Sequence, residues 1–460
     1  MPTHLSRLQH GRAPHPTLDE SRRAGKALRR ELPRTAHRER SSESRDPLAV
    51  LEAQNAIRLE HLVPLRIERM LATPFTFYRG TAGIMAADLA REAVTGIQVV
   101  GCGDAHISNF GLFASPQRTL VFDLNDFDEA ATGPWEWDVK RLVTSVVIGA
   151  RDAGFQERTT RDLALTTAAA YREGLREMMQ LDALGRYFTR LDTDAPRAEL
   201  GSAAQKVLDK AVRQARRRTS AAFVEKISTR ADDGTLLIVE DPPVLTHLAT
   251  SLEDEIEELF ELYRATVPAD IAELLSHFTL TDVAMRVVGV GSVGTRCYIL
   301  ILTGPSGEPL VLQVKEAQPS VYETFGGVVP MGAGSTPSAA RPYVSEGQRV
   351  VDKQRILQAV SDPFLGHLQF GGRDFYVRQF RDMKGSIDTA TLSPKPFARY
   401  GSACGTALAR AHAQSFEAPA ISGYLGRSAE FDEAVVDWSF AYADQSRADY
   451  EALRASVTGA

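Results

Sequence analysis

The stretch CGDAHISNFGLFASPQRTLVFDLNDFDEA, residues 102–130, contains a dense group of chemically useful side chains. Asp104 and Asn109 stand five residues apart, just after an apolar run that predicts a strand. A carboxylate can accept the proton of an attacking hydroxyl, and a nearby amide oxygen can hold a magnesium ion. The spacing therefore predicts a loop suited to phosphoryl transfer, with Asp104 as the base and Asn109 as a metal ligand.

Three more carboxylates follow after a predicted hairpin, at Asp123, Asp126 and Asp128. Hard oxygen ligands suit Mg²⁺, so a carboxylate at the end of this hairpin could bind a metal that bridges phosphates. Turn formation alone does not readily explain so many acids between apolar strands. By hairpin length Asp123 lies at the strand end, so it competes with Asp126 for the role of metal ligand.

A glycine pattern lies far along the chain, in GVGSVG at residues 289–294. Gly289, Gly291 and Gly294 let backbone amides approach phosphate oxygens closely. The run RCYILIL that follows predicts a strand instead of a helix, which argues against a dinucleotide fold. A tight hairpin that needs glycine for positive φ is the alternative. Lys315 lies on the next predicted strand, where it would neutralise phosphate oxygens.

The composition indicates a globular protein and excludes several classes. The apolar fraction is 43%, the charged fraction 24% and the net charge −6, so there is no overall attraction to nucleic acid or anionic lipid. Three widely spaced cysteines disfavour zinc fingers and disulfide frameworks. No apolar run is long enough for a membrane helix, and the expected compartment is the cytoplasm. We expect neither nucleic acid nor membrane as a partner.

Patterns along the 460 residues predict four segments. Residues 1–46 read as a polar arm that is either mobile or laid across a folded body. Residues 47–284 read as a large helical lobe that carries the catalytic and metal-binding loops. Residues 285–385 begin with a three-stranded antiparallel meander and form a small β-rich lobe. Residues 386–460 are predicted helices that return to the large lobe.

Three motifs together resemble the aminoglycoside phosphotransferases and related kinase-like enzymes. These are GDAHISN (103–109), DFDEAATGPWEWDV (126–139) and LARAHAQ (408–414). The resemblance implies an α+β, two-lobed protein-kinase-like fold that binds ATP and Mg²⁺. Such enzymes usually place the glycine loop and the lysine before the catalytic loop, and here they come after it. A circularly permuted chain would restore the order. The chain also resembles the bacterial domain-of-unknown-function family 2252 (DUF2252).

The resemblance to the phosphotransferases implies roles for individual residues. Asp104 would be the catalytic base and Asn109 a magnesium ligand. Asp126 would be the main metal carboxylate, because its distance to Asp138 suits the phosphotransferase pattern. His106 would set the geometry of the loop.

Other features of a kinase-like site stay open or differ. The glutamate that would pair with Lys315 is either Glu323 or Glu346, and we prefer Glu346 because it introduces a predicted helix. Arg79, in FYRG, either meets a phosphate or is a structural arginine. No Ala-Pro-Glu motif follows the metal loop, so a small-molecule acceptor is expected instead of a protein.

The expected function is ATP- and Mg²⁺-dependent phosphoryl transfer to a hydroxyl group of a small molecule. One alternative is a kinase-fold enzyme that transfers AMP, or a nucleotide-binding regulator without catalysis. A metallophosphohydrolase is a further alternative, since GD-x-H also occurs in two-metal phosphoesterases. That class needs clustered histidines, whereas the histidines downstream are isolated.

Overall fold

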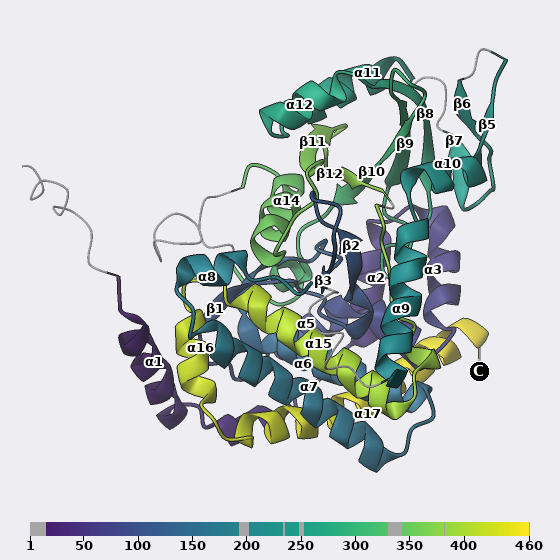
Figure 1. Cartoon of the computed structure of the whole chain (residues 1–460). Helices are drawn as coiled ribbons and strands as arrows, with labels where there is room; N and C mark the ends of the chain where they lie inside the picture. Colours follow the sequence, from purple (N-terminus) through teal and green to yellow (C-terminus); the bar gives the residue numbers. More distant parts are fainter. Residues whose placement is uncertain are drawn as a thin grey trace, which may run out of the picture.

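Most of the long helices gather in one part of the molecule and the main sheet in another, with a few shorter helices beside the sheet, as Figure 1 shows. The computed structural model describes residues 15–192, 202–232, 235–247, 253–329, 343–380 and 382–459. Within these ranges the chain is a mixed α+β protein whose strands form small antiparallel sheets. No helix in these ranges combines the length and the apolar character that crossing a membrane requires.

Four long helices form the centre of the helical part. They are α6 (Trp135–Asp152), α7 (Glu157–Met178), α15 (Pro394–His412) and α17 (Glu430–Thr458). The predicted apolar face of α6 is buried, but so is nearly every other residue of that helix. Polar side chains on α6 must therefore find partners inside the protein, because a buried polar group without a hydrogen bond is costly. These partners build much of the site described below.

Shorter helices surround this centre. They are α1 (Leu18–Ala27), α2 (Pro47–Ala56), α3 (Val63–Met70), α4 (Pro74–Arg79), α5 (Ala82–Leu89), α8 (Ala183–Phe188), α9 (Ser202–Arg217) and α16 (Ala418–Leu425). Helix α1 packs against α16, so this part of the predicted N-terminal arm is laid across the folded body. Residues 1–14 of that arm lie outside the described residues.

Two short antiparallel pairs carry the loops of residues 102–130. Strand β1 (Gln98–Gly101) pairs with β4 (Ala131–Pro134), and β2 (Phe110–Ala114) pairs with β3 (Leu120–Leu124). The β2–β3 hairpin separates the two polar loops in sequence, and the β1–β4 pair brings their far ends back together. The loops therefore lie side by side.

The main sheet has six strands in the order β11-β12-β10-β9-β8-β7. The strands are β7 (Leu245–His247), β8 (Thr279–Arg286), β9 (Cys297–Thr303), β10 (Pro309–Ala317), β11 (Gly366–Phe370) and β12 (Arg373–Gln379). Each neighbouring pair is antiparallel, so the predicted meander, here β8-β9-β10, is confirmed. Helices α13 (Val321–Thr324) and α14 (Glu346–Leu357) lie in the sequence between β10 and β11.

The predicted lobe boundary at residues 284 and 285 falls inside β8. Strand β7 and the helices α11 (Glu253–Arg264) and α12 (Ala269–Leu275) also pack with the sheet, although they precede this boundary. Helix α10 (Ser220–Ile227) and the hairpin of β5 (Ser228–Arg230) and β6 (Leu236–Ile238) lie in the same region. An amphipathic helix reveals its own apolar face in the sequence, but not the surface against which that face packs.

Strand β10 decides what the sheet presents to the helical part. Leu310, Leu312 and Val314 belong to the apolar cluster under α11. Because side chains alternate along a strand, Gln313 and Lys315 point to the opposite face, where they line a cavity. The alternation places one buried lysine toward the loops of residues 102–130.

Candidate active site

The loop that carries Asp104 is anchored on α6. Asp138 accepts hydrogen bonds from the backbone N–H groups of Cys102 and Gly103, at 2.7 and 3.0 Å. The Ser145 hydroxyl accepts another from the Ile107 N–H, at 2.9 Å. Gly103 has a φ of +76°, and a Cβ there would lie 2.1 Å from a neighbouring carbonyl oxygen, so only glycine fits. Buried polar groups of α6 thus fix the backbone beside Asp104.

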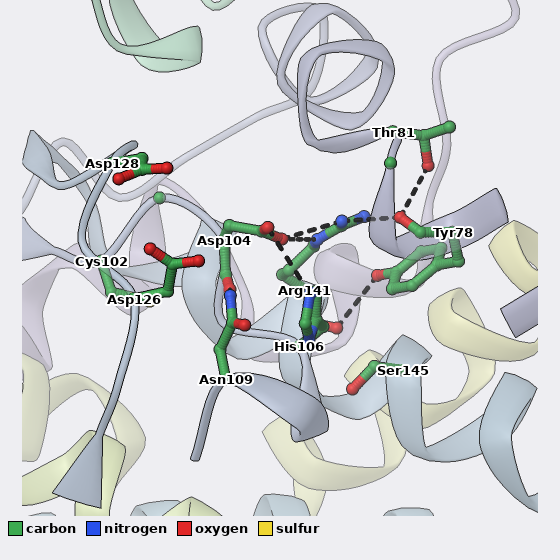
Figure 2. Close-up of polar contacts among 12 residues, drawn as sticks. Tyr78, Thr81, Cys102, Asp104, His106, Asn109, Asp126, Asp128, Arg141 and Ser145 are labelled. Carbon is green, nitrogen blue, oxygen red and sulfur yellow. Dashed lines mark hydrogen bonds and ion pairs between the residues drawn. The ribbon is translucent and has the colours of Figure 1, made fainter. Parts of the chain in front are cut away.

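The Asp104 carboxylate is held by Arg141 of α6 (Figure 2). The Arg141 Nε donates to Asp104 Oδ1 at 2.8 Å, and its Nη2 donates to the Tyr78 carbonyl at 2.7 Å. The Asn109 amide donates to the Asp104 carbonyl at 2.8 Å. The Asp104 side chain keeps 19% of its surface exposed and lines a cavity. Asp104 is therefore held in one orientation and is reachable from the cavity.

His106 lies behind Asp104, with its Nε2 3.6 Å from Asp104 Oδ2. Burial outweighs the attraction of that carboxylate and lowers the pKa of His106 to about 4. The imidazole is therefore neutral near pH 7 and serves the packing of the loop.

Asp126 and Asp128 come from the neighbouring loop and face the same region as Asp104 and Asn109 (Figure 2). Asp126 Oδ1 is buried and has no hydrogen-bond partner within the described part of the chain. Burial opposes its ionisation, but the nearby cations, Lys315 first, lower the pKa of Asp126 to about 2. Asp128 accepts a hydrogen bond from the Tyr376 hydroxyl at 2.6 Å. Asp126 therefore has an oxygen that accepts no hydrogen bond from a described residue, whereas both oxygens of Asp128 already have partners, Tyr376 and Lys315.

Asp123 was predicted as a competing metal ligand, and the structure does not bring it to this site. Its Oδ1 accepts the Leu124 N–H at 2.9 Å, and its Oδ2 accepts the Ala359 N–H at 2.8 Å. Burial raises its pKa. Asp123 still belongs to β3, so it points into the protein and ties the hairpin to the segment after α14.

Lys315 reaches the acidic loop from β10. Its Nζ forms an ion pair with Asp128 and lies 3.8 Å from Asp126 Oδ1. Burial disfavours the charge, but the two aspartates outweigh it and raise the pKa of Lys315. A lysine and two carboxylates from sequence positions almost two hundred apart thus meet at one point.

The predicted glutamate partners of Lys315 are wrong. Glu346 Oε2 accepts a hydrogen bond from Arg349 Nε at 2.5 Å, and Glu323 Oε1 accepts one from the Tyr343 hydroxyl at 2.8 Å. Arg349 is fully buried and donates to the carbonyls of Asp128, Ala130 and Gln318. This arginine ties the acidic loop to the end of β10.

The glycine loop covers the site and is bonded to the N-terminal helices. Gly289 and Gly294 have φ values of +72° and +88°, which favour glycine. The Gly289 carbonyl accepts from Arg69 Nη1 at 2.8 Å, and the Val293 carbonyl accepts from Arg58 Nη1 at 2.7 Å. A Cβ at Gly291 would lie 3.3 Å from the Arg79 carbonyl. The loop is packed tightly against the helical part.

Two cavities meet beneath this loop and share Asn109, Asp126 and Ser292. The smaller has about 70 Å³ and contains Asp104, Asp128 and Gly291 in its lining. The larger has about 660 Å³, and Gln313 and Lys315 are in its lining. The predicted groups Asp104, Asn109, Asp126, Lys315, Gly289 and Gly291 therefore line one or other of two adjoining cavities, whereas the predicted Gly294 is in the lining of neither.

Arg79, for which two roles were open, lines the smaller cavity with Asp104. Its Nε is buried and has no hydrogen-bond partner among the described residues. Burial lowers the pKa of Arg79, while Asp104 and Asp126 oppose that effect. This position suits contact with an anionic ligand.

The acidic groups suit a magnesium ion carried by phosphates. Within the described ranges there is no group of three or more His, Cys, Asp or Glu side chains arranged to hold a metal. Mg²⁺ is commonly bound through one or two carboxylates plus substrate phosphates and water. Asp126 Oδ1, which accepts no hydrogen bond among the described residues, fits that mode of binding together with Asn109, which lines the same cavities.

Residues 58–456 match the family described as an uncharacterized protein conserved in bacteria (DUF2252). This match covers most of the chain, so the protein belongs to that family, as the sequence motifs predicted. No curated protein and no solved structure matched the chain.

Several residues of the site were not expected from the sequence. Arg141, Arg349 and Tyr376 hold Asp104, the acidic loop and Asp128, respectively. Each is a single polar residue in a regular helix or strand, and no local motif marks it. Of the three, Arg141 had a usable signal, because an arginine within the apolar pattern of α6 has to find an internal partner.

Proposed function

We propose that this protein transfers a phosphoryl group from ATP to a hydroxyl group of a small molecule, with Mg²⁺ bound to the nucleotide. One observation carries the proposal. Lys315 on the main sheet meets Asp126 and Asp128, while Asp104 and Asn109 line the adjoining cavity under a glycine loop. Phosphoryl transfer requires these kinds of groups around one phosphate chain.

The order of elements supports a kinase-like fold with a permuted chain. From β8, the chain passes through the glycine loop, β9, the lysine strand β10, helix α14, β11 and β12. Helix α15 then ends beside the catalytic loop, because His412 Nε2 lies 3.1 Å from the loop anchor Asp138. Just after this helix, the Ser415 hydroxyl accepts the Val100 N–H at 2.9 Å. Joining this end to β1 would give the order expected of kinase-like chains.

Each residue of the site has a chemical task in this proposal. Asp104, fixed by Arg141, accepts the proton of the acceptor hydroxyl. Asn109 and Asp126 would hold Mg²⁺, which supplies positive charge to the phosphate oxygens. Lys315 would exchange its contact with Asp128 for phosphate oxygens, and the backbone of residues 289–294 would approach them from above.

A test compares wild type with Asp104→Asn, using calorimetry for Mg·ATP binding and labelled ATP for turnover, with water as the default acceptor. We expect ATP affinity to stay within about threefold and turnover to fall at least about 100-fold, since only the proton acceptor is lost. Asp19→Asn, on the distant helix α1, is the matched control. Full turnover in Asp104→Asn, or no ATP binding by wild type, would refute the proposal.

A second candidate is transfer of AMP by the same site. The observation that favours it is the concentration of basic side chains in the larger cavity, away from Asp104. Terminal phosphates bound there would bring the α-phosphorus toward Asp104. Attack of a hydroxyl on that phosphorus would break the α–β bridge and release pyrophosphate. Label from α-labelled ATP in the product would identify this reaction, and label from γ-labelled ATP would identify phosphoryl transfer.

A further inference from the structure

Two basic residues of the larger cavity have no part in the function proposed above. Arg378 lies on β12 and Lys384 lies in the segment that follows this strand, and both line the cavity. In the β10–β12 register, Arg378 is paired with Gln313, and Lys315 lies two residues further along β10 on the same face. The two residues therefore extend the basic surface that begins at Lys315.

Within the part of the chain that the structure describes, neither side chain has a carboxylate partner within hydrogen-bonding distance, although Asp126 and Asp128 act on both from further away. Burial, followed by the nearby Arg378, lowers the pKa of Lys384 to about 7, and a bound anion would favour its charged form. Arg378 Nε donates to Gln313 Oε1 at 2.9 Å, and its Nη1 donates to the Asn125 carbonyl at 3.3 Å. Lys384 Nζ donates to the same carbonyl, also at 3.3 Å. All these acceptors are neutral. Across the described ranges neither residue forms an ion pair within 4.0 Å.

The acidic residues of the cavity are occupied elsewhere. Asp362 accepts the backbone N–H groups of Phe364 and Gln379. Asp382 pairs with Arg118. This leaves two carboxylates, Asp126 and the Asp128 that pairs with Lys315, to face the three cations Lys315, Arg378 and Lys384, in a chain whose net charge is −6. A local excess of positive charge in a part-buried cavity favours an anionic ligand.

We infer that Arg378 and Lys384 form a subsite that binds the oxygens of a phosphate group in the larger cavity. A guanidinium offers a planar pair of donors and an ammonium a compact charge, which together match a group with three acceptor oxygens and about two negative charges. A carboxylate offers only two oxygens and one charge. The phosphate comes either from the nucleotide or from the acceptor. The inference deepens the proposed function, since both concern the same cavity.

The test measures binding to wild type and Lys384→Met by calorimetry, with tripolyphosphate, Mg·ATP and adenosine as probes. We expect Lys384→Met to lower the affinity for tripolyphosphate at least about tenfold, because one charged contact to phosphate is lost. Lys384→Arg should retain most of the affinity, and Lys395→Met, an exposed lysine on α15, should retain all of it. Thermal unfolding of each variant checks that it folds, and Arg378→Gln provides an independent second variant.

The outcomes separate the two sources of phosphate. If Lys384→Met weakens the binding of Mg·ATP and leaves the binding of adenosine unchanged, the subsite belongs to the nucleotide. If Lys384→Met binds Mg·ATP with unchanged affinity but binds inorganic phosphate more weakly in the presence of a saturating non-hydrolysable ATP analogue, the subsite belongs to the acceptor. If the protein binds no ATP but still binds tripolyphosphate in a way that depends on Lys384, the phosphate subsite is supported and the proposed function is refuted. Equal affinities for every probe in wild type, folded Lys384→Met and folded Arg378→Gln would overturn the inference.

Discussion

Asp138→Asn is a sharp test of how the loop of residues 102–109 is held. Asp138 is 1% exposed and accepts five hydrogen bonds, of which the weakest comes from the Cys102 thiol at 3.8 Å. Oδ2 accepts from the Cys102 N–H and from His412 Nε2, and Oδ1 accepts from the Gly103 N–H and the Tyr322 hydroxyl. Asparagine has nearly the same shape, so the change removes charge and one acceptor without leaving a cavity.

The magnitude follows from this geometry. His412 can change its tautomer and the Tyr322 hydroxyl can rotate, but a backbone N–H can only donate. In either orientation of the new amide, its NH₂ group therefore faces the N–H of Cys102 or Gly103. An unpaired buried donor costs about 1–3 kcal/mol, and weakening of the other, formerly charged bond adds about 1 kcal/mol. We expect the free energy of unfolding to fall by about 2–4 kcal/mol.

Urea unfolding followed by circular dichroism measures this change, and amide hydrogen exchange reports on Cys102 and Gly103 directly. Tyr322→Phe is the matched control, because it removes a single bond to Asp138 and spares both backbone donors, with an expected cost of about 1 kcal/mol. The reasoning is refuted if Asp138→Asn unfolds within about 0.5 kcal/mol of wild type and both amides keep their protection.

Three more predictions concern stability. The pKa of His37, usually 6.5, is lowered by burial to about 3, so the folded state resists protonation and stability is lost as pH falls below the unfolded pKa. By about pH 5 His37 alone accounts for a loss of about 2 kcal/mol. Because the lowered pKa of His106 acts in both proteins, urea unfolding should show a loss that is about 2 kcal/mol larger in wild type than in His37→Gln, and equal losses would contradict the prediction. Gly103→Ala should lower the free energy of unfolding by at least about 2 kcal/mol in thermal or urea unfolding. Residue 103 has a left-handed backbone conformation, and the new Cβ would collide with the Glu129 carbonyl. Unchanged stability would contradict this loop geometry. Lys315→Met should lower the free energy of unfolding in urea by about 2 kcal/mol. The loss is smaller than for a fully buried ion pair because the acidic partners of Lys315 are 36% and 25% exposed. The same variant should bind Mg·ATP more weakly in calorimetry, and unchanged stability would show that the ion pair contributes nothing.

Local spacing predicted the part of the site that depends on a single loop or strand. Asp104 and Asn109 lie within one short loop, and alternation along β10 fixes the direction of Lys315. Asp123 was harder, because hairpin length does not tell at which residue the chain leaves the strand. Asp123 remains in β3, and three residues later Asp126 has left the strand and faces the cavity.

The partner of Lys315 could not be read from the sequence, because it depends on how α14 is rotated against β10. In the structure Glu346 faces along its own helix to Arg349, one turn away. The acidic loop itself supplies the counter-charge to Lys315. A sequence motif defines groups that are close along the chain, whereas this contact depends on the docking of separate elements.

The attachment of the glycine loop affects how a ligand could enter. In addition to the bonds from Arg58 and Arg69 to loop carbonyls, the Leu59 N–H donates to the Gly294 carbonyl at 2.8 Å. Lifting the loop would break all three bonds and expose arginines that are partly buried now. The glycine loop is therefore tied to Arg58 and Leu59, between α2 and α3, and to Arg69 of α3, so opening the pocket beside Asp104 by lifting this loop would cost three hydrogen bonds.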